Sequence, residues 1–259
     1  MKAFILAAGV GSRLVRVAQN RPKCLLTVGG RTLISRMLDL LESRGIEDIT
    51  VITGYRADLV RREVADRARL VHNPFFHTTN SIASLWFARE HLEGDALITN
   101  GDLFFEPGML DELLSDPRDP VMLCDSTRIV DADYRFTLDR DRIVAYGKDI
   151  PVERTSAEYV GQARIGATFM PHFRRRLEDL IDQQKSGMWW EDVLYSFIPE
   201  GTPVFARDVA GVFWGEVDYV EDYERIVRWA NSHRTASEDP RPAAGGVQAV
   251  AEPVARAHV

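Results

Sequence analysis

Short apolar runs alternate with amphipathic stretches along the first half of the chain. The runs are typical of buried strands and predict strands at residues 2–6, 48–53, 70–71, 96–99 and 121–124. The stretches between them repeat apolar residues at helical spacing and predict helices at residues 32–44, 58–67, 81–91 and near 109–114. Strands that are separated by helical crossovers form a mostly parallel sheet, which binds ligands at the carboxyl ends of its strands.

The pattern changes after Asp125. Residues 134–138 and 142–146 are split by a polar turn and predict an antiparallel hairpin, and residues 164–169 predict another strand. A helix with an apolar face follows that strand, and the last predicted helix begins after Asp218. This region is predicted to form a lid over a ligand site at the sheet edge.

The whole pattern predicts an α/β fold with a Rossmann-like, mostly parallel sheet, helices on both faces and a small α+β lid subdomain. We place one domain at residues 1–233 and its lid at about residues 126–200. Residues 234–259 are rich in Pro, Ala, Gly and charge without periodicity, which predicts a disordered tail.

Composition narrows the class of protein. The 259 residues carry a net charge of −7, which argues against a general nucleic-acid binder. No apolar run approaches the ~18 residues of a membrane span, and no export signal begins the chain. Two distant cysteines, Cys24 and Cys124, are typical of free thiols in a reducing compartment. These features predict a soluble, cytoplasmic protein without a membrane partner, and they leave a homodimer open.

The first strand runs into a glycine-rich turn that can bind phosphate. Gly9 and Gly11 let the backbone approach a ligand, while Arg13 and Lys23 supply cations. A dinucleotide fingerprint needs a third glycine where this chain has Leu14, and the P-loop sequence is absent. The alternative is a glycine-rich surface turn with two solvated cations. The combination favours a grip for a nucleoside triphosphate.

Carboxylates near the ends of two predicted strands are candidate metal ligands. Asp102 follows the strand at residues 96–99, and Glu216 and Asp218 share one face of a short strand. Transfer to a nucleotide α-phosphorus generally uses Mg²⁺ held by one or two carboxylates and phosphate oxygens. Two alternatives stay open: Asp102 closing a turn, and Asp218 capping a helix with Glu221 in a capping box.

Three further groups have a structural and a functional interpretation. Lys148, after the hairpin, is either a solvated lysine or a contact for the phosphorus group of a second substrate, which would accept the nucleotide group and is called the acceptor below. Asn80 suits a helix cap as well as a nucleotide contact. The second half of the chain, where we expect the acceptor to bind, contains aromatic and acidic residues that could cage an ammonium group or fill a lid core. They include Tyr159, Trp189, Trp190, Glu191 and Trp214. Of these, Trp190 favours the core.

The residues from Leu6 to Leu14, followed by Pro22-Lys23, resemble the signature of the nucleotidyltransferases. Later motifs resemble the phosphocholine and phosphonate cytidylyltransferase branch, and they are Asn80-x-x-x-Ser84-Leu, Gly101-Asp102, Gly147-Lys148, Glu158-Tyr-Val-Gly161, Trp190-Glu-Asp192 and Trp214-Gly-Glu-Val-Asp218. The resemblance covers about residues 1–231. It implies a cytidylyltransferase that couples CTP to a small phosphomonoester or phosphonate, uses Mg²⁺ and releases pyrophosphate.

We predict three groups of site residues from the motifs and this resemblance. The nucleotide-binding set is Leu6, Ala7, Ala8, Gly9, Gly11, Ser12, Arg13, Lys23, Asn80, Ser84, Gly101 and Asp102. The acceptor-binding set is Lys148, Tyr159, Trp189, Glu191 and Trp214. The metal ligands are Asp102, Asp218 and Glu216, and the catalytic cations are Arg13, Lys23 and Lys148.

The chain departs from the branch on the acceptor side. Asp133-Tyr-Arg-Phe136 stands where the family has a Glu-Met-Lys-like stretch, so the difference concerns the acceptor and not the type of reaction. Arg135 and Arg164 suggest an acceptor with an extra carboxylate. Two alternative functions stay open: a sugar-1-phosphate nucleotidyltransferase that uses UTP, dTTP or GTP, and a catalytically silent nucleotide-binding module that regulates a partner.

Overall fold

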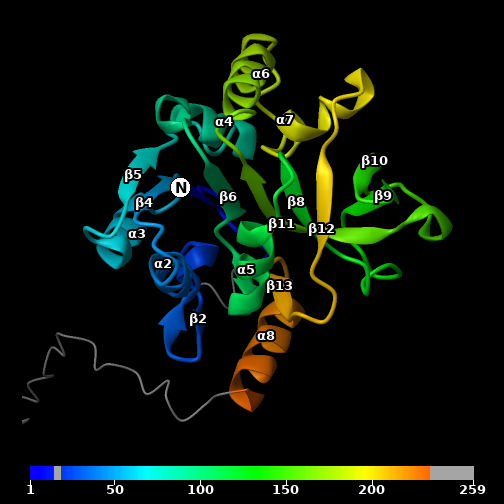
Figure 1. Ribbon diagram of the computed structural model, residues 1–259. Coiled ribbons are helices and arrows are strands. Elements are labelled where there is room, and N and C mark those ends of the chain that lie inside the picture. The colour runs from blue at the N-terminus through cyan, green and yellow to red at the C-terminus, as the bar shows by residue number, and fades with distance from the viewer. Residues whose placement is uncertain (15–18, 234–259) are drawn as a thin grey trace, which may run out of the picture.

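The structure is a computed structural model that describes residues 1–14 and 19–233 (Figure 1). It is built on a nine-stranded sheet with the strand order β5-β4-β1-β6-β11-β8-β12-β10-β9. The strands are β1 (Lys2–Ala7), β4 (Asp48–Thr53), β5 (Arg69–His72), β6 (Ala96–Asn100), β8 (Val121–Asp125), β9 (Arg135–Asp139), β10 (Arg142–Gly147), β11 (Ala157–Ile165) and β12 (Phe205–Asp208). Two small pairs accompany it, β2 (Thr27–Val28) with β3 (Arg31–Thr32) and β7 (Leu103–Phe105) with β13 (Trp214–Glu216). The tail predicted at residues 234–259 lies outside the described residues.

The first four strands of the sheet run parallel, as predicted. β1 lies between β4 and β6, and Leu6 at its end pairs with Ile52 and Asn100. The strands therefore end side by side, and the loops that follow β1 and β6 meet at one edge. This edge positions both the glycine-rich turn and Asp102.

The second half of the sheet is mainly antiparallel, so the sheet as a whole is mixed. β11 pairs antiparallel with β6 and β8, and the predicted hairpin is confirmed as β9 and β10. β9 also pairs with β11, and β10 pairs with β12, so both edges of the hairpin are bonded. Segment 126–200 thus contributes strands to the same sheet as the first half of the chain. That this segment forms a separate lid subdomain stays a prediction.

The strand predicted at residues 164–169 is displaced in the structure. β11 begins at Ala157 and ends at Ile165, and residues 167–169 form the turn into the next helix. The Gly166 amide donates to Asp119 Oδ1 instead of to a neighbouring strand, and the Met170 amide donates to the Gly166 carbonyl. These bonds end the strand and start the helix, although the side chains around them are apolar.

Helices cover both faces of the sheet and bury separate apolar clusters. α2 (Leu33–Glu42), α3 (Ala57–Val64) and α5 (Pro107–Ser115) pack on one face. α4 (Ser81–Phe87), α6 (Met170–Asp182) and α7 (Asp192–Tyr195) pack on the other, at the top of Figure 1. α8 (Val220–Ser232) buries Ile226 in a third cluster with Leu14 and Phe104. None of the described helices has the length and apolarity needed to cross a membrane.

Short 3₁₀ turns complete the fold. They are η1 (Ser12–Leu14), η2 (Lys23–Leu25), η3 (Arg89–His91), η4 (Val152–Arg154) and η5 (Ile198–Glu200). The helix predicted at residues 81–91 is therefore divided into α4 and η3. η1 and η2 hold the two cations of the glycine-rich region close to the end of β1, so they connect the fold to the site.

Candidate active site

A cavity of about 1360 Å³ lies at the carboxyl ends of β1 and β6. Its walls come from the glycine-rich turn, the start of α4, the segment between β8 and β9, the hairpin, the segment before α7 and the segment from β13 into α8. The site residues predicted from the sequence that line it are Leu6, Ala8, Gly9, Arg13, Lys23, Asn80, Ser84, Asp102, Lys148, Tyr159, Trp189, Glu191, Trp214, Glu216 and Asp218. The fold thus gathers residues from distant parts of the chain around one space.

Lys23 lines the cavity, and its side chain passes close to Gly11 in the glycine-rich turn. Gly11 has a φ of +64°, and a Cβ at this position would lie 2.7 Å from Lys23 Cγ. Glycine is needed there both for the left-handed backbone and for the passage of the lysine side chain. Arg13 lines the same end of the cavity, with its guanidinium 5.1 Å from the ring centre of Tyr219. The two predicted cations therefore lie at one end of the cavity.

The Lys23 ammonium joins two carboxylates that are far apart in the sequence. Its Nζ lies 3.1 Å from Asp102 Oδ2 and also forms an ion pair with Asp218 Oδ1. Burial alone would lower the pKa of Lys23, but these two carboxylates outweigh it and raise the pKa above its ordinary value. The lysine therefore stays charged, and Asp102 and Asp218 face the same point.

Local structure explains why both carboxylates face the cavity. Asp102 lies in the tight turn between β6 and β7, where a Cβ on Gly101 would come within 2.8 Å of the Leu6 carbonyl oxygen. Asp218 follows β13 but does not cap α8, because Tyr219 occupies the N-cap position and its amide donates to Asp222 Oδ2 at 2.9 Å. Asp102 therefore closes a turn, as one alternative predicted, and it also lines the cavity. The other alternative, in which Asp218 caps the last helix, is wrong.

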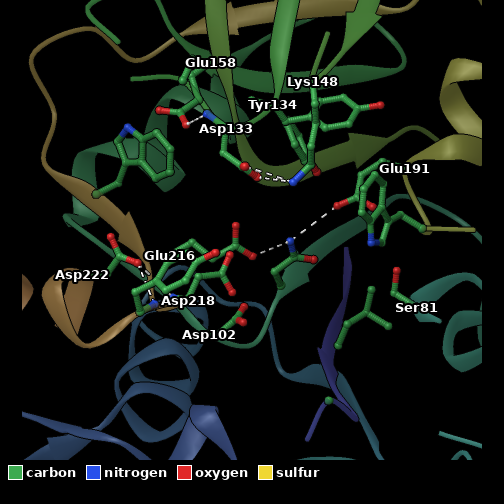
Figure 2. A pocket seen from close by; sticks show the side chains of 18 of the residues that line it. Ser81, Asp102, Asp133, Tyr134, Lys148, Glu158, Glu191, Glu216, Asp218 and Asp222 are labelled. Atoms are coloured by element: carbon green, nitrogen blue, oxygen red, sulfur yellow. Dashed lines mark hydrogen bonds and ion pairs between the residues drawn. The ribbon is translucent and has the colours of Figure 1, made fainter. Parts of the chain in front are cut away.

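Glu216 is a third carboxylate at this end (Figure 2). Burial, followed by the neighbouring charges of Asp102 and Asp218, raises its pKa well above the ordinary value. Its Oε1 accepts a hydrogen bond of 3.2 Å from Asn100 Nδ2. Among residues 1–14 and 19–233, no three Asp, Glu, His or Cys side chains form a cluster that could hold a metal ion by themselves. Asp102 and Asp218, which face the same cation, are the pair best placed to share one.

The start of α4 forms another wall of the cavity. Asn80 Oδ1 accepts a hydrogen bond of 2.8 Å from the Ser81 amide, so Asn80 caps the helix while it lines the cavity. Ser84 is buried, and its Oγ accepts a hydrogen bond of 3.0 Å from Asn73 Nδ2. Asn80 thus has the structural role foreseen for it, Ser84 lies within α4, and both residues still line the cavity.

The opposite end of the cavity is aromatic and charged. Trp189 is 42% exposed and packs edge-on against Tyr134 at 5.8 Å between ring centres. Lys148 Nζ lies 2.7 Å from Asp133 Oδ2 and 5.4 Å from the Trp189 ring centre. Figure 2 shows Lys148, Asp133 and Tyr134 across the cavity from Asp102 and Asp218. This end is therefore separate from the Lys23 end.

The tryptophans divide between core and cavity. Trp190 is fully buried and donates from Nε1 to Asn100 Oδ1 at 2.9 Å, which agrees with its predicted core position. Trp214 is 3% exposed and lines the cavity, and its Nε1 donates to Asp125 Oδ2 at 2.8 Å. Trp189 is the one of these three tryptophans with a large exposed surface.

Asn100 connects the two ends of the cavity. Its Nδ2 lies 3.2 Å from Glu216 Oε1 and 3.5 Å from Glu191 Oε1. Glu191 is 7% exposed, and burial raises its pKa to about 8. A single amide therefore contacts one carboxyl group from each end.

The Glu191→Gln variant is expected to gain stability relative to the wild type as the pH rises from about 5 to 8.5. The folded protein holds a proton on Glu191 that the unfolded chain releases at lower pH, so this group costs stability as the pH rises toward 8. The difference should be on the order of a few kcal/mol. Thermal unfolding at both pH values measures it, with the exposed Glu153→Gln as the matched control. An equal effect at both pH values would contradict it.

Several predicted residues lie outside the cavity lining. Ala7 packs in the apolar cluster that α2, α3 and α5 cover. Side chains alternate along β1, and the adjacent Leu6 and Ala8 line the cavity. Gly11 and Gly101 contribute backbone shape around Lys23 and β1, and the side chain of Ser12 lies outside the described part. Their predicted nucleotide contacts stay predictions.

The proposal of an acceptor carboxylate bound by Arg164 is wrong. Arg164 is buried away from the cavity and donates to the Asp116 and Arg118 carbonyls at 2.6 and 2.5 Å. Arg135 lines the cavity, but it donates to the carbonyls of Ile150 and Val130 at 3.0 and 3.3 Å. Both guanidiniums are thus held by the backbone.

Sequence reasoning missed several residues that line the cavity. They include Asn100, Arg128, Asp222 and Arg225, while Asp133 and Tyr134 were placed on the acceptor side without a role in the site. The position of Asn100 directly before Gly101-Asp102 was a usable signal, since it also ends β6. Arg128 and Arg225 gave no such signal, because only the fold brings α8 beside the segment after β8.

Known proteins resemble this chain over most of its length. The choline-phosphate cytidylyltransferase of Streptococcus pneumoniae is 26% identical over 87% of this chain and 96% of its own length. CMP-5'-(3-aminopropyl)phosphonate synthase of Streptomyces rubellomurinus is 29% identical over 84% of this chain, which spans only 37% of that protein. The solved structure of CTP:phosphocholine cytidylyltransferase from Streptococcus pneumoniae matches the fold with a TM-score of 0.75, 22% identity, and coverage of 88% of this chain and 98% of its own.

A family model gives the broadest assignment. The model for the MobA-like NTP transferase domain matches residues 3–186, well over half of the chain. The relatives include the phosphonate and phosphocholine cytidylyltransferases that the motifs indicated, and the predicted α/β nucleotidyltransferase fold is confirmed. The chain belongs to the family of MobA-like NTP transferase domains.

Proposed function

We propose that this chain is a Mg²⁺-dependent cytidylyltransferase. It couples CTP to a small phosphomonoester or phosphonate and gives a CMP-linked product and pyrophosphate. Phosphocholine, 2-aminoethylphosphonate and related phosphonates are the acceptor class. The names and extent of the relatives support this assignment.

One observation carries the proposal most directly. Lys23, Asp102 and Asp218 meet at the end of β1, beside Gly9 and Arg13 in the same cavity. Phosphoryl transfer depends mainly on placing the substrates and on neutralising charge, so an enzyme needs cations and metal-binding carboxylates at one point. The arrangement supports binding of a triphosphate at this end.

Asp102 and Asp218 fit a divalent cation. Their carboxylates already converge on one ammonium, and Mg²⁺ commonly takes one or two carboxylates with phosphate oxygens completing its ligands. When bound there, Mg²⁺ neutralises charge on the triphosphate. Glu216 is close to both carboxylates and would be either a third ligand of the ion or a group just outside its ligands.

The reaction needs no general base in this proposal. An anionic oxygen of the acceptor attacks the α-phosphorus of CTP, and the bond from that phosphorus to the bridging oxygen of the β-phosphate breaks. Pyrophosphate leaves with that oxygen, and Arg13 and Lys23 offset the charge on the α-phosphate and the leaving group. Lys23 is well suited to this role because it stays charged.

The acceptor occupies the aromatic end. Trp189 offers an exposed face, while Glu191 and Tyr159 line the cavity beside it. Such a set suits a small amine-bearing head group. Lys148 lies at the rim of this end and would contact the acceptor after leaving Asp133.

Pyrophosphate release tests the proposal. The purified chain is assayed with Mg²⁺, four nucleoside triphosphates and a panel of phosphocholine, 2-aminoethylphosphonate, 2-hydroxyethylphosphonate, phosphonoformate and glucose-1-phosphate. Release with CTP and a small phosphorus acceptor is expected. Release with glucose-1-phosphate alone would assign a sugar-1-phosphate nucleotidyltransferase instead. Nucleotide binding without release for any pair would favour a regulatory module.

A further inference from the structure

Arg128 is held in a fixed orientation on the wall of the cavity. Its guanidinium carbon lies 4.0 Å from the ring centre of Trp214, and its Nη2 donates to the Trp214 carbonyl at 2.6 Å. Trp214 is itself fixed by burial and by its hydrogen bond to Asp125. The stacked, planar fork is therefore ordered before any ligand arrives, which is favourable for binding oxyanions.

The Nε and Nη1 atoms of Arg128 form no hydrogen bond shorter than 3.5 Å with the described residues. Its Nε is 3.6 Å from Asp125 Oδ2 and its Nη1 is 3.8 Å from Glu158 Oε2, which is too long for direct hydrogen bonds in the described part of the chain. Both carboxylates have closer donors, since Asp125 accepts from Thr127 and Glu158 accepts from the Asp133 amide at 2.8 Å. Arg128 thus keeps capacity for another acceptor of hydrogen bonds.

A second guanidinium lies at the same place. Arg225 on α8 lines the cavity and donates from Nη1 to the same Trp214 carbonyl at 3.3 Å. Burial and then the positive charge of Arg225 lower the pKa of Arg128. Asp125, Glu158 and Asp222 are the negative charges nearby, and Asp222 is engaged by the Tyr219 amide at 2.9 Å. Two guanidiniums that share one carbonyl would both gain from an added anion.

We infer that Arg128, supported by Arg225, binds the phosphonate or phosphate group of the acceptor. The inference rests on the proposed function and adds the residues that hold the reacting group. Arg128 lies beside Glu158, which Figure 2 places on the side of the cavity away from Glu191. An acceptor with its phosphorus group at Arg128 can therefore direct its other end toward Glu191 and Trp189.

The other cations of the cavity are less suited to this task. Arg13 and Lys23 lie at the triphosphate end, and the Lys148 ammonium is paired with Asp133 at 2.7 Å. Arg135 donates to two backbone carbonyls, and its Nε, which has no partner among the described residues, is buried. Arg128 is therefore the group on the acceptor side that combines a fixed fork with unused donors.

Acceptor kinetics of Arg128→Met test the inference. Methionine retains an apolar side chain over Trp214 and removes the charge. The KM for the acceptor should rise by about 30-fold or more, while the KM for CTP changes less than about threefold, because the lost hydrogen bonds are charge-assisted and belong to one substrate. Arg128→Lys should retain an intermediate acceptor KM. An acceptor KM within twofold of the wild type, or equal rises for both substrates, would overturn the inference.

Arg89 provides a matched control for folding. Its guanidinium lies 3.8 Å from the ring centre of Trp86 and donates to the Trp86 carbonyl at 3.1 Å, but it is outside the cavity. Arg89→Met should alter the thermal midpoint about as much as Arg128→Met and leave both KM values unchanged. If Arg89→Met raises the acceptor KM as well, the effect is one of stability and the inference fails.

Direct binding separates this inference from the proposed reaction. Calorimetric titration of the wild type and Arg128→Met with methylphosphonate requires no turnover. Binding that is lost in Arg128→Met supports the inference, even if no acceptor in the panel gives pyrophosphate. Equal binding by both proteins, or no binding by the wild type, contradicts it.

Discussion

Replacing Lys23 with alanine is expected to lower kcat/KM for pyrophosphate release by about 10²- to 10³-fold or more. Lys23 is the charged group that lies between Asp102 and Asp218, at the end of the cavity that we propose binds the triphosphate. Without it, a positive charge is missing where the leaving group develops negative charge. The two carboxylates also lose the cation that offsets their repulsion, so nucleotide binding should weaken as well.

The measurement is initial-rate kinetics at saturating Mg²⁺, with circular dichroism to check the fold. Lys185→Ala is the matched control, since Lys185 is exposed in the segment that follows α6 and lies outside the cavity lining. The control should keep wild-type rates. Wild-type turnover in Lys23→Ala would remove the central assignment of this end of the cavity.

Removal of divalent cations with EDTA is expected to abolish pyrophosphate release, and added Mg²⁺ should restore it. Asp102→Asn and Asp218→Asn should each lower kcat/KM by about 10²-fold or more, because an amide supplies no negative charge to a metal ion. Each variant should also need a higher Mg²⁺ concentration for half-maximal rate. Titration of the rate against Mg²⁺ measures both effects.

The exposed Asp66→Asn is the control for these variants and should behave as the wild type. Asp102 and Asp218 contribute from different elements, so both variants must show the effect if they share one ion. Full activity in EDTA would contradict the metal requirement. A loss in only one variant would place the ion away from the other carboxylate.

The first half of the fold could be predicted closely from the sequence. The strand at residues 48–53 is the observed β4, and the helix starting near Thr32 is α2, capped by the Thr32 side chain. These elements follow from local rules, namely continuous apolar runs, helical spacing and caps. The glycine-rich region was also readable, because its residues lie within a short stretch and take their shape from the local chain.

The second half depended on distant partners. The end of β11 is set by the hydrogen bond from Gly166 to Asp119, which no local pattern reveals. Likewise, Arg128 and Arg164 are both arginines near strands, yet one lines the cavity and the other is buried against two carbonyls. Residue type alone could not separate them, since the difference lies in which neighbours the fold supplies.

The ion pairs of Lys23 have a consequence for the order of binding. An ammonium tethered between Asp102 and Asp218 competes with any free divalent cation at a high effective concentration. Triphosphate oxygens can draw this ammonium away and at the same time supply further ligands to the metal. Nucleotide and metal should therefore bind with positive cooperativity, which would be visible as a tighter Mn²⁺ titration in the presence of CTP. An unchanged titration would show that the lysine does not act as such a tethered competitor.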